Sequence, residues 1–267
     1  MFENRLINDK INLIMKKVIL IILIVIILTI ALVVGVFVLN GNKYYKELIA
    51  EKSIETCVNE IRNNKNFTKK EDMTKEYLDA VVAVEDHRYY EHGAIDAFAL
   101  ARAIVVNISN KKYKEGGSTI TQQLAKNMYF MDGTKDPEGY FESALQKIAE
   151  AFISTELEKK YSKDEILEMY VNIIYFGQSN YGIKEASNYY YDKDPNTLNL
   201  DEASLLAGIP NAPSLYNPID SMEYARSRQK KVLSSMVEYN YITQEQMDQV
   251  INNINDNTTK NIEDTEE

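Results

Sequence analysis

The stretch E-G-G-S-T-I-T-Q-Q-L-A-K-N, residues 115–127, decides where the central helix of the chain begins. Two glycines mark a turn, and Thr119 with Gln122 three residues later forms a capping box, so the sequence predicts a helix from about Ile120. A helix start presents free backbone N–H groups and a partial positive charge, which suits phosphate or pyrophosphate when a lysine such as Lys126 follows. The alternative from these residues alone is an ordinary capped amphipathic helix with a solvated lysine.

Far upstream of this helix lies an apolar run without a charged residue, residues 18–39. As a helix it would be about 33 Å long, enough to cross the apolar core of a bilayer. The run is too long for a signal-peptide core, and no A-x-A-like site follows it. Four basic residues precede it: Arg5, Lys10, Lys16 and Lys17. We therefore expect a retained single-pass anchor in the cell membrane, with residues 1–17 in the cytoplasm and the chain from residue 40 outside the cytoplasm.

The composition excludes some classes of function. A net charge of −10 and a pI near 4.9 argue against a nucleic-acid partner, which needs a basic footprint. An anionic ligand would have to be met by a local basic cluster. Cys57 is the only cysteine, so an internal disulfide is impossible.

A carboxylate stands at the end of a predicted helix over residues 73–84. Leu78 and Val82 lie on one apolar face of that helix, and Glu85 occupies the next step of the same series. Such a carboxylate is partly desolvated and is a candidate acid or base. The alternative is that Glu85 lies beyond the helix end and faces water. The two histidines that follow, His87 and His92, indicate a metal site only weakly, since no nearby residue completes a His/Cys set.

The rest of the chain also predicts helices. Capping boxes occur at Ser162 with Glu165 and at Asn199 with Glu202, and Gly208 stops the helix that follows the second one. No stretch alternates with period two long enough to predict a strand. We expect a mainly α fold whose residues 40–72 form a stalk, residues 73–251 the main domain, and residues 252–267 a disordered acidic tail.

Five ordered segments resemble the motifs of the peptidoglycan glycosyltransferases, which are the transglycosylase domains of class A penicillin-binding proteins and their monofunctional relatives. The segments are Glu85-Asp86 with Tyr89 and His92; G-G-S-T-I-T-Q-Q-L-A-K-N at residues 116–127; Lys147-x-x-Glu150; K-D-E-I-L-E-M-Y-V-N at residues 163–172; and Arg228-x-x-x-Val232-Leu233. The resemblance covers residues 74–236. It implies a lysozyme-like helical head with a smaller membrane-proximal lobe.

The same resemblance implies a reaction and its residues. Lipid II would be polymerised into β-1,4-linked glycan strands with release of undecaprenyl pyrophosphate, and Glu85 would be the general base. Glu150 matches the family's second glutamate, which holds basic residues and the reacting sugar. The substrate-binding positions carried over are Asp86, Arg102, Ser118, Thr119, Gln122, Gln123, Lys126, Asn127 and Lys147. Magnesium or manganese at the pyrophosphate is left open. Expected partners are lipid II, the growing glycan strand, membrane lipid and other proteins of cell-wall synthesis and division.

The chain departs from the family pattern in places. Gln146 stands where the third motif has an arginine, which puts pyrophosphate contacts on that side in doubt. The S-x-x-K pattern of a transpeptidase occurs at residues 109–112 and 227–230, but K-T-G does not occur, so the sequence predicts a monofunctional enzyme. Two other classes of function stay open: a lysozyme-like peptidoglycan hydrolase and a non-catalytic scaffold of the synthesis machinery.

Overall fold

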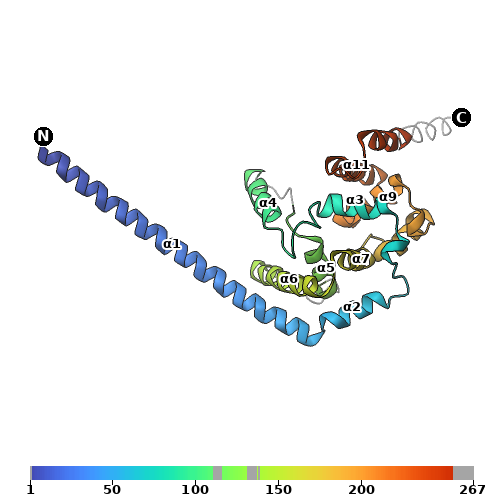
Figure 1. Cartoon of the computed structure of the whole chain (residues 1–267), viewed down its shortest axis with the longest axis horizontal. Helices are drawn as coiled ribbons and strands as arrows, with labels where there is room; N and C mark the ends of the chain where they lie inside the picture. Colours follow the sequence, from blue (N-terminus) through green and yellow to red (C-terminus); the bar gives the residue numbers. More distant parts are fainter. Residues whose placement is uncertain (1, 111–115, 131–136, 138, 255–267) are drawn as a thin grey trace. The chain divides into compact units, whose positions relative to one another are not determined.

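The structure is a computed structural model that describes residues 2–110, 116–130, 137 and 139–254, and within these it leaves out the side chains of residues 2–9 and 11. All regular elements over the described residues are helical, and an isolated bridge joins Tyr175 to Tyr181. The predicted mainly α fold is confirmed (Figure 1). The named elements are α1 (Phe2–Glu51), α2 (Ile54–Arg62), η1 (Lys70–Asp72), α3 (Lys75–Glu85), α4 (Ala97–Asn110), α5 (Ile120–Phe130), α6 (Tyr140–Lys160), α7 (Lys163–Ile173), α8 (Gly182–Tyr191), η2 (Pro195–Thr197), α9 (Leu200–Gly208), η3 (Ile209–Asn211), α10 (Pro213–Tyr216) and α11 (Met222–Glu238).

The chain divides into two compact units. The first comprises Met1–Leu48 and Pro137–Ala149, and the second comprises Ile49–Asp136 and Glu150–Glu267. The boundary passes through α6, whose first half belongs to the first unit and whose second half belongs to the second.

The first unit consists mainly of α1, and its apolar part has the length and composition of a membrane-spanning helix. The candidate span is Asn12–Glu51, with a mean hydropathy of 3.6 over its most apolar window and no burial of that window by protein. It contains the predicted anchor, residues 18–39. Within the same unit the rings of Phe37 and Phe141 lie 5.2 Å apart, so α1 contacts the start of α6. The prediction of one long apolar N-terminal helix is confirmed, and the cytoplasmic placement of residues 1–17 stays a prediction.

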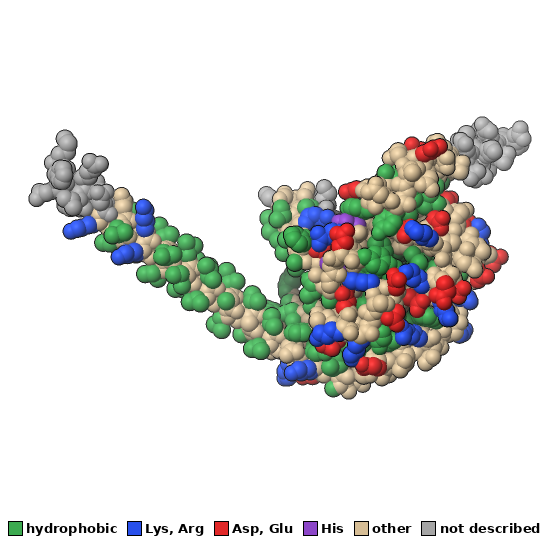
Figure 2. All heavy atoms as spheres, in the orientation of Figure 1, with side chains coloured by type: hydrophobic (Ala, Val, Ile, Leu, Met, Phe, Trp, Pro, Cys, Tyr) green, Lys and Arg blue, Asp and Glu red, His purple; other side chains and the backbone are tan. Residues whose placement is uncertain are grey.

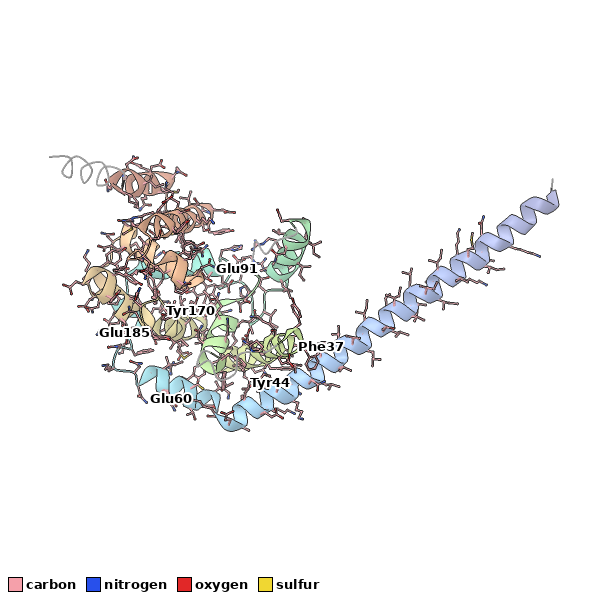
Figure 3. All side chains as sticks on the ribbon, turned by 180° about the vertical axis from the view of Figure 1, so that it is seen from behind. Phe37, Tyr44, Glu60, Glu91, Tyr170 and Glu185 are labelled. Carbon is pink, nitrogen blue, oxygen red and sulfur yellow. The ribbon has the colours of Figure 1, made fainter. Side chains whose placement is uncertain are left out.

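The second unit has a core built from two groups of helices. One group packs α3, α9 and α11 against one another, and the other packs α5 and α8 against α7. Several large side chains in this core are fully buried, among them Tyr77 of α3, Leu124 of α5 and Tyr170 of α7. Figure 3 shows Tyr170 among the helices of this unit.

All three predicted capping boxes form. The N–H of Gln122 donates to the hydroxyl of Thr119 at 3.1 Å, and the Gln122 side-chain oxygen accepts from the Thr119 N–H at 3.0 Å. Ser162 starts α7 in the same reciprocal way with Glu165, and Asn199 starts α9 with Glu202. These boxes are readable from sequence because both partners lie within one helical turn.

The segment predicted as a stalk, residues 40–72, is helical over much of its length but is partly packed. The last turns of α1 and then α2 cover most of it, and within the second unit α2 contacts α7. Ile54, Cys57 and Val58 of α2 are buried. A stalk surrounded by solvent would leave these three side chains exposed, so α2 belongs with the packed part of the second unit.

Helix α4 has 14 residues, and Ala103 is the only one of them that is buried. Its apolar side chains are instead exposed, with Phe98 at 76% and Ile108 at 72%. In Figure 2 the region of α4 shows as apolar surface. The helix is predictable from the apolar content of residues 97–108, but its exposure is not.

Candidate active site

Glu85 is the last residue of α3, and its carboxylate is held by two neighbours. Its Oε2 accepts a hydrogen bond from Nε2 of Gln123 at 2.9 Å. Its Oε1 is buried, lies 3.6 Å from a guanidinium nitrogen of Arg228, and accepts no hydrogen bond from the residues that the structure describes. The side chain is 13% exposed. The open question from the sequence is thereby answered: Glu85 ends the helix and turns inward rather than into water.

Arg228 reaches Glu85 from α11 by passing over the end of α9. Its Nε donates to the carbonyl of Gly208 at 3.4 Å. A Cβ at Gly208 would lie 2.9 Å from Cγ of Arg228, so only glycine leaves room for the arginine stem at this point. The sequence places Arg228 in a motif but predicts no role for it, because nothing in its local pattern indicates contact with a residue on a distant helix.

Gln123 links Glu85 to the core. Its Oε1 accepts a hydrogen bond from the hydroxyl of Tyr170 at 2.9 Å, while its Nε2 binds Glu85. Burial raises the pKa of Tyr170 well above its ordinary value, and the charge of Glu85 adds to this. The tyrosine therefore stays protonated and acts as a donor. Tyr170 lies in the quoted fourth motif but was not predicted as a site residue.

Asp86, the neighbour of Glu85, fastens the start of α5 to the loop that follows α3. Its Oδ2 accepts from the N–H of Ile120 at 3.0 Å, and its Oδ1 lies 2.7 Å from Nε2 of His92. Nδ1 of His92 faces the carbonyl of Gly93 at 2.6 Å. The ring of His92 is thus held between a side-chain carboxylate and a backbone carbonyl.

This arrangement changes the interpretation of the helix start. The N–H groups of Ile120 and Gln122, predicted to be free for phosphate, donate to Asp86 and Thr119. A carboxylate also occupies the position beside the N-terminus that suits an anion. These contacts make Asp86, Thr119 and Gln122 parts of the support of α5, and their predicted contact with substrate stays a prediction.

Asp96 completes the loop. It forms a two-pronged ion pair with Arg88, at 2.9 and 3.1 Å, and accepts from the N–H groups of Phe98 and Ala99 at the start of α4. Desolvation alone would raise the pKa of Asp96. It is outweighed by the hydrogen bond from Ala99 and the charge of Arg88, so that the pKa lies below its usual value.

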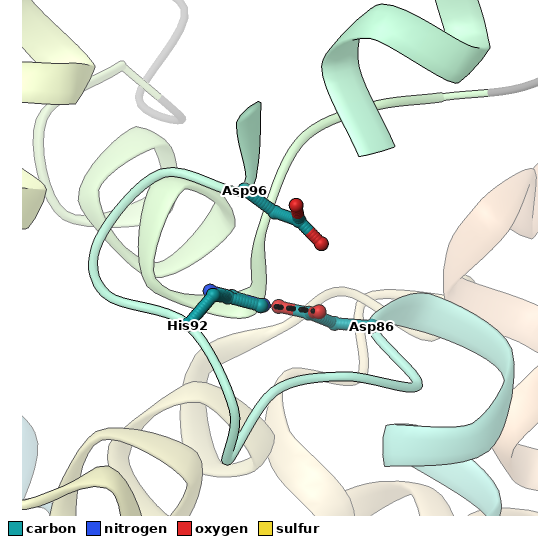
Figure 4. Close-up of side chains that lie close together, drawn as sticks. All are labelled: Asp86, His92 and Asp96. Atoms are coloured by element: carbon teal, nitrogen blue, oxygen red, sulfur yellow. Dashed lines mark hydrogen bonds and ion pairs between the residues drawn. The ribbon is translucent and has the colours of Figure 1, made fainter. Parts of the chain in front are cut away.

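Asp86, His92 and Asp96 form a group whose possible ligand atoms all lie within 4.8 Å of one another (Figure 4). Spacing along the sequence did not identify this group, because Asp96 lies outside the paired histidines. Each member is engaged: Asp86 by Ile120 and His92, and Asp96 by Arg88 and the α4 N-terminus. The group therefore fits a hydrogen-bonded clasp better than a metal site.

Glu85 opens onto a small pocket of about 30 Å³. Five of the predicted site residues line it, together with His87, Asp96, Ala99, Gly116 and Gly117; the five are Glu85, Asp86, Arg102, Ser118 and Thr119. A Cβ at Gly117 would lie 3.0 Å from Cα of Leu100, so glycine lets the loop approach α4 closely. Desolvation lowers the pKa of His87 and the charge of Arg102 lowers it further, which favours a neutral ring at this wall.

The remaining predicted site residues are placed as follows. Lys126 is exposed on α5, and Nδ2 of Asn127 donates to the Gln123 carbonyl at 2.7 Å. Glu150 is fully buried in the second unit. Lys147 and Gln146 belong to the first unit, with Lys147 exposed and Gln146 buried. The pocket therefore unites part of the predicted set, and the roles of Lys126, Lys147 and Glu150 stay predictions.

Comparisons with known proteins agree with this picture of the chain. A protein-family model described as "Transglycosylase" matches residues 51–237. Penicillin-binding protein 1A of Neisseria lactamica is 43% identical over 188 residues, which is 70% of this chain and 23% of that protein. Penicillin-binding protein 1A of Vibrio cholerae is 41% identical over 180 residues, 67% of this chain and 21% of that protein. The chain thus spans less than a quarter of the length of these two relatives.

A solved structure is also similar in part. The crystal structure of penicillin-binding protein 1A from Haemophilus influenzae matches with 23% identity and a TM-score of 0.40, covering 69% of this chain and 17% of that one.

Proposed function

Because the chain belongs to the transglycosylase family, we propose that it is a peptidoglycan glycosyltransferase that polymerises lipid II into β-1,4-linked glycan strands with release of undecaprenyl pyrophosphate. The observation that carries the proposal is the carboxylate of Glu85, which is mostly buried, fixed through one oxygen, and located at the wall of a pocket that Arg102 and Ser118 share.

In the proposed reaction Glu85 is the general base. It takes the proton from the 4-hydroxyl of the acceptor sugar while that oxygen attacks the anomeric carbon of the donor. The bond from that carbon to the pyrophosphate oxygen breaks, and its electron pair leaves with undecaprenyl pyrophosphate. A carboxylate fixed within hydrogen-bonding reach of the hydroxyl suits this proton transfer. A guanidinium nitrogen of Arg228 lies 3.6 Å from Oε1, so a positive charge stands beside the proposed base.

The leaving pyrophosphate gains negative charge as the bond breaks, so cationic groups near it would stabilise the transition state more than the bound substrate. Arg102 is the cation that lines the pocket with Glu85. The family resemblance adds Lys126 and Lys147 on the donor side, with Ser118, Gln123 and Asn127 as polar contacts and Glu150 as an organiser of the basic residues.

Magnesium or manganese would neutralise part of the pyrophosphate charge if the reaction uses either ion. No step of the proposed mechanism passes through a metal, since proton transfer and bond formation are assigned to the side chains alone. Adding each ion after treatment with a chelator measures the requirement directly.

The site would operate on the outer side of the cell membrane. Lys10, Lys16 and Lys17 precede the apolar part of α1, and an excess of basic residues is typical of the cytoplasmic end of an anchor. The second unit would then face the compartment in which lipid II is polymerised, close to membrane lipid. Labelling of single introduced cysteines on either side of the membrane would test this orientation, after Cys57 is replaced.

The test of the proposal is an assay with full-length protein, purified lipid II and several detergents. Glycan strands longer than the substrate, together with released undecaprenyl pyrophosphate, are the expected products. Cleavage of finished peptidoglycan without growth from lipid II would instead identify a hydrolase. Inactivity with lipid II under all detergents and metal ions would favour a scaffold of the synthesis machinery.

A further inference from the structure

Three helices meet in a line of two hydrogen bonds at the carboxylate of Glu85. The Tyr170 hydroxyl of α7 donates to Oε1 of Gln123 on α5, and Nε2 of Gln123 donates to Oε2 of Glu85 at the end of α3, each bond at 2.9 Å. Tyr170 is 1% exposed, and Gln123 is half-buried. Tyr170 therefore has no route to the substrate except through Gln123.

The order of donors and acceptors along these two hydrogen bonds fixes the orientation of the Gln123 side-chain amide. An ionised carboxylate only accepts hydrogen bonds, so the amide must present its nitrogen to Glu85. Its oxygen then faces the tyrosine, and burial keeps the pKa of Tyr170 far above the pH at which cells live, so the hydroxyl always has a proton to donate. With the amide reversed, its oxygen would face the carboxylate, and two acceptors would oppose each other.

Fixing the amide distinguishes the two oxygens of Glu85. Oε2 carries the bond from Gln123, whereas Oε1 is buried 3.6 Å from Arg228, with no hydrogen-bond donor among the described residues. Gln123 and Arg228 thus hold one oxygen each, at opposite ends of the carboxylate. A Gln123 amide that rotated away would leave the carboxylate free to turn about its last bond, and a base with two interchangeable orientations is less well placed for proton transfer.

We propose that Tyr170 is a positioning residue that acts through Gln123 to hold the Glu85 carboxylate in one orientation at the pocket wall; this inference depends on the proposed glycosyltransferase function. Other buried tyrosines of the second unit do not share this arrangement. Tyr129 donates to the backbone carbonyl of Lys52, and Tyr89 to that of Lys163, so their hydroxyls support the fold rather than a reacting group.

The experiment compares Tyr170→Phe with Tyr129→Phe in full-length protein, using lipid II polymerisation and thermal unfolding. Both substitutions remove a hydroxyl from a buried tyrosine, at 1% and 5% exposure, that makes a 2.9 Å hydrogen bond. For Tyr170→Phe we expect kcat to fall roughly tenfold with KM for lipid II nearly unchanged, a loss equivalent to one hydrogen bond. For Tyr129→Phe we expect kcat to stay within about twofold of the unmutated value. Its thermal stability should fall by about as much as that of Tyr170→Phe, since each variant loses one buried hydrogen bond.

A double-mutant cycle separates positioning from general stability. Because Tyr170 acts through the amide, Gln123→Ala should lower kcat at least as much as Tyr170→Phe, and the two changes together should be no worse than Gln123→Ala alone. Independent, multiplied losses would overturn the proposal. So would a Tyr170→Phe enzyme that matches Tyr129→Phe in kcat. If the unmutated protein does not polymerise lipid II, the proposed function itself fails, which is a different result from either of these.

Discussion

Glu85 and Asp86 are neighbours in the chain but belong to two differently built regions. The Asp86 region is complete: one carboxylate oxygen receives the Ile120 N–H, and the other faces His92. The Glu85 region is incomplete. Oε2 accepts a hydrogen bond from Gln123, whereas Oε1 lies 3.6 Å from Arg228 and accepts no hydrogen bond from the described residues.

The difference favours Glu85 as the carboxylate that does the proposed chemistry. A buried carboxylate whose two oxygens both have hydrogen-bond partners supports the fold. A mostly buried carboxylate with an oxygen that lacks a donor is costly to the fold, and such groups are typical of functional sites. The end of α3 therefore places side by side a carboxylate that supports the fold and the carboxylate proposed as the base.

The sharpest way to test this contrast is Glu85→Gln, which keeps the size of the side chain and removes the base. We expect the rate of lipid II polymerisation to fall by about a thousandfold or more, since a general base contributes roughly 10²–10⁴. Thermal stability should stay the same or rise slightly, because an underpaired buried charge is removed. Rates are measured with purified lipid II and folding by circular dichroism. Retained polymerisation by this variant would remove Glu85 from the mechanism.

The opposite result is expected for Asp86→Ala. It leaves the Ile120 N–H and His92 without their partner, so the free energy of unfolding should fall by about 2–4 kcal/mol, as for loss of hydrogen bonds to a buried charge. Equilibrium unfolding in denaturant measures the change. Asp79→Ala is the control on the same helix: its ion-pair partner Lys75 is 81% exposed, so the loss should stay below about 1 kcal/mol. Equal losses in the two variants would show that the Asp86 clasp is not a special support.

Arg228→Ala tests the other half of the contrast, the ion pair at Oε1. Without the guanidinium, Glu85 loses the positive charge that lies 3.6 Å from Oε1, and the rate should fall about tenfold to thirtyfold at neutral pH. Arg228→Lys keeps a positive charge and should recover part of the rate. Both variants are assayed as kcat and KM for lipid II. An Arg228→Ala enzyme as active as the unmutated one would confine Arg228 to packing over Gly208.

How much of this could be predicted from the sequence depended on the distance between partners along the chain. The box of Thr119 and Gln122 was predictable because the two residues lie one turn apart and their reciprocal bonds are local. The approach of Arg228 to Glu85 was not, because it requires α11 to pack on α3 and glycine at position 208 to admit the arginine stem.

The helix start at Ile120 shows the same limit within one motif. Its position was predicted correctly, but the proposed role of its N–H groups was not supported, because Asp86 lies 34 positions earlier and no local pattern shows that it folds back onto them. Helix α4 gives a further case. Its apolar content predicts a helix, yet apolar content alone does not distinguish a buried helix from one with Phe98 and Ile108 exposed.

The smallest effect is expected from His87, which borders both regions in the pocket. Desolvation and the charge of Arg102 lower its folded-state pKa, with Arg88 acting in the same direction and Asp86 and Asp96 in the opposite one. The unfolded chain then binds more protons than the folded one as the pH falls below about 6.5, so stability is lost from that pH downward and is unaffected above it. His87→Gln should remove this part of the pH dependence. The melting temperatures of the two proteins should differ little at pH 8. Between pH 7 and about pH 5 the melting temperature of the unmutated protein should fall by more than that of His87→Gln. A steeper fall of the melting temperature in His87→Gln would mean that the folded protein favours the charged ring. The Tyr239 ring stacked on His87 at 4.1 Å, or the charges of Asp86 and Asp96, would then be the cause.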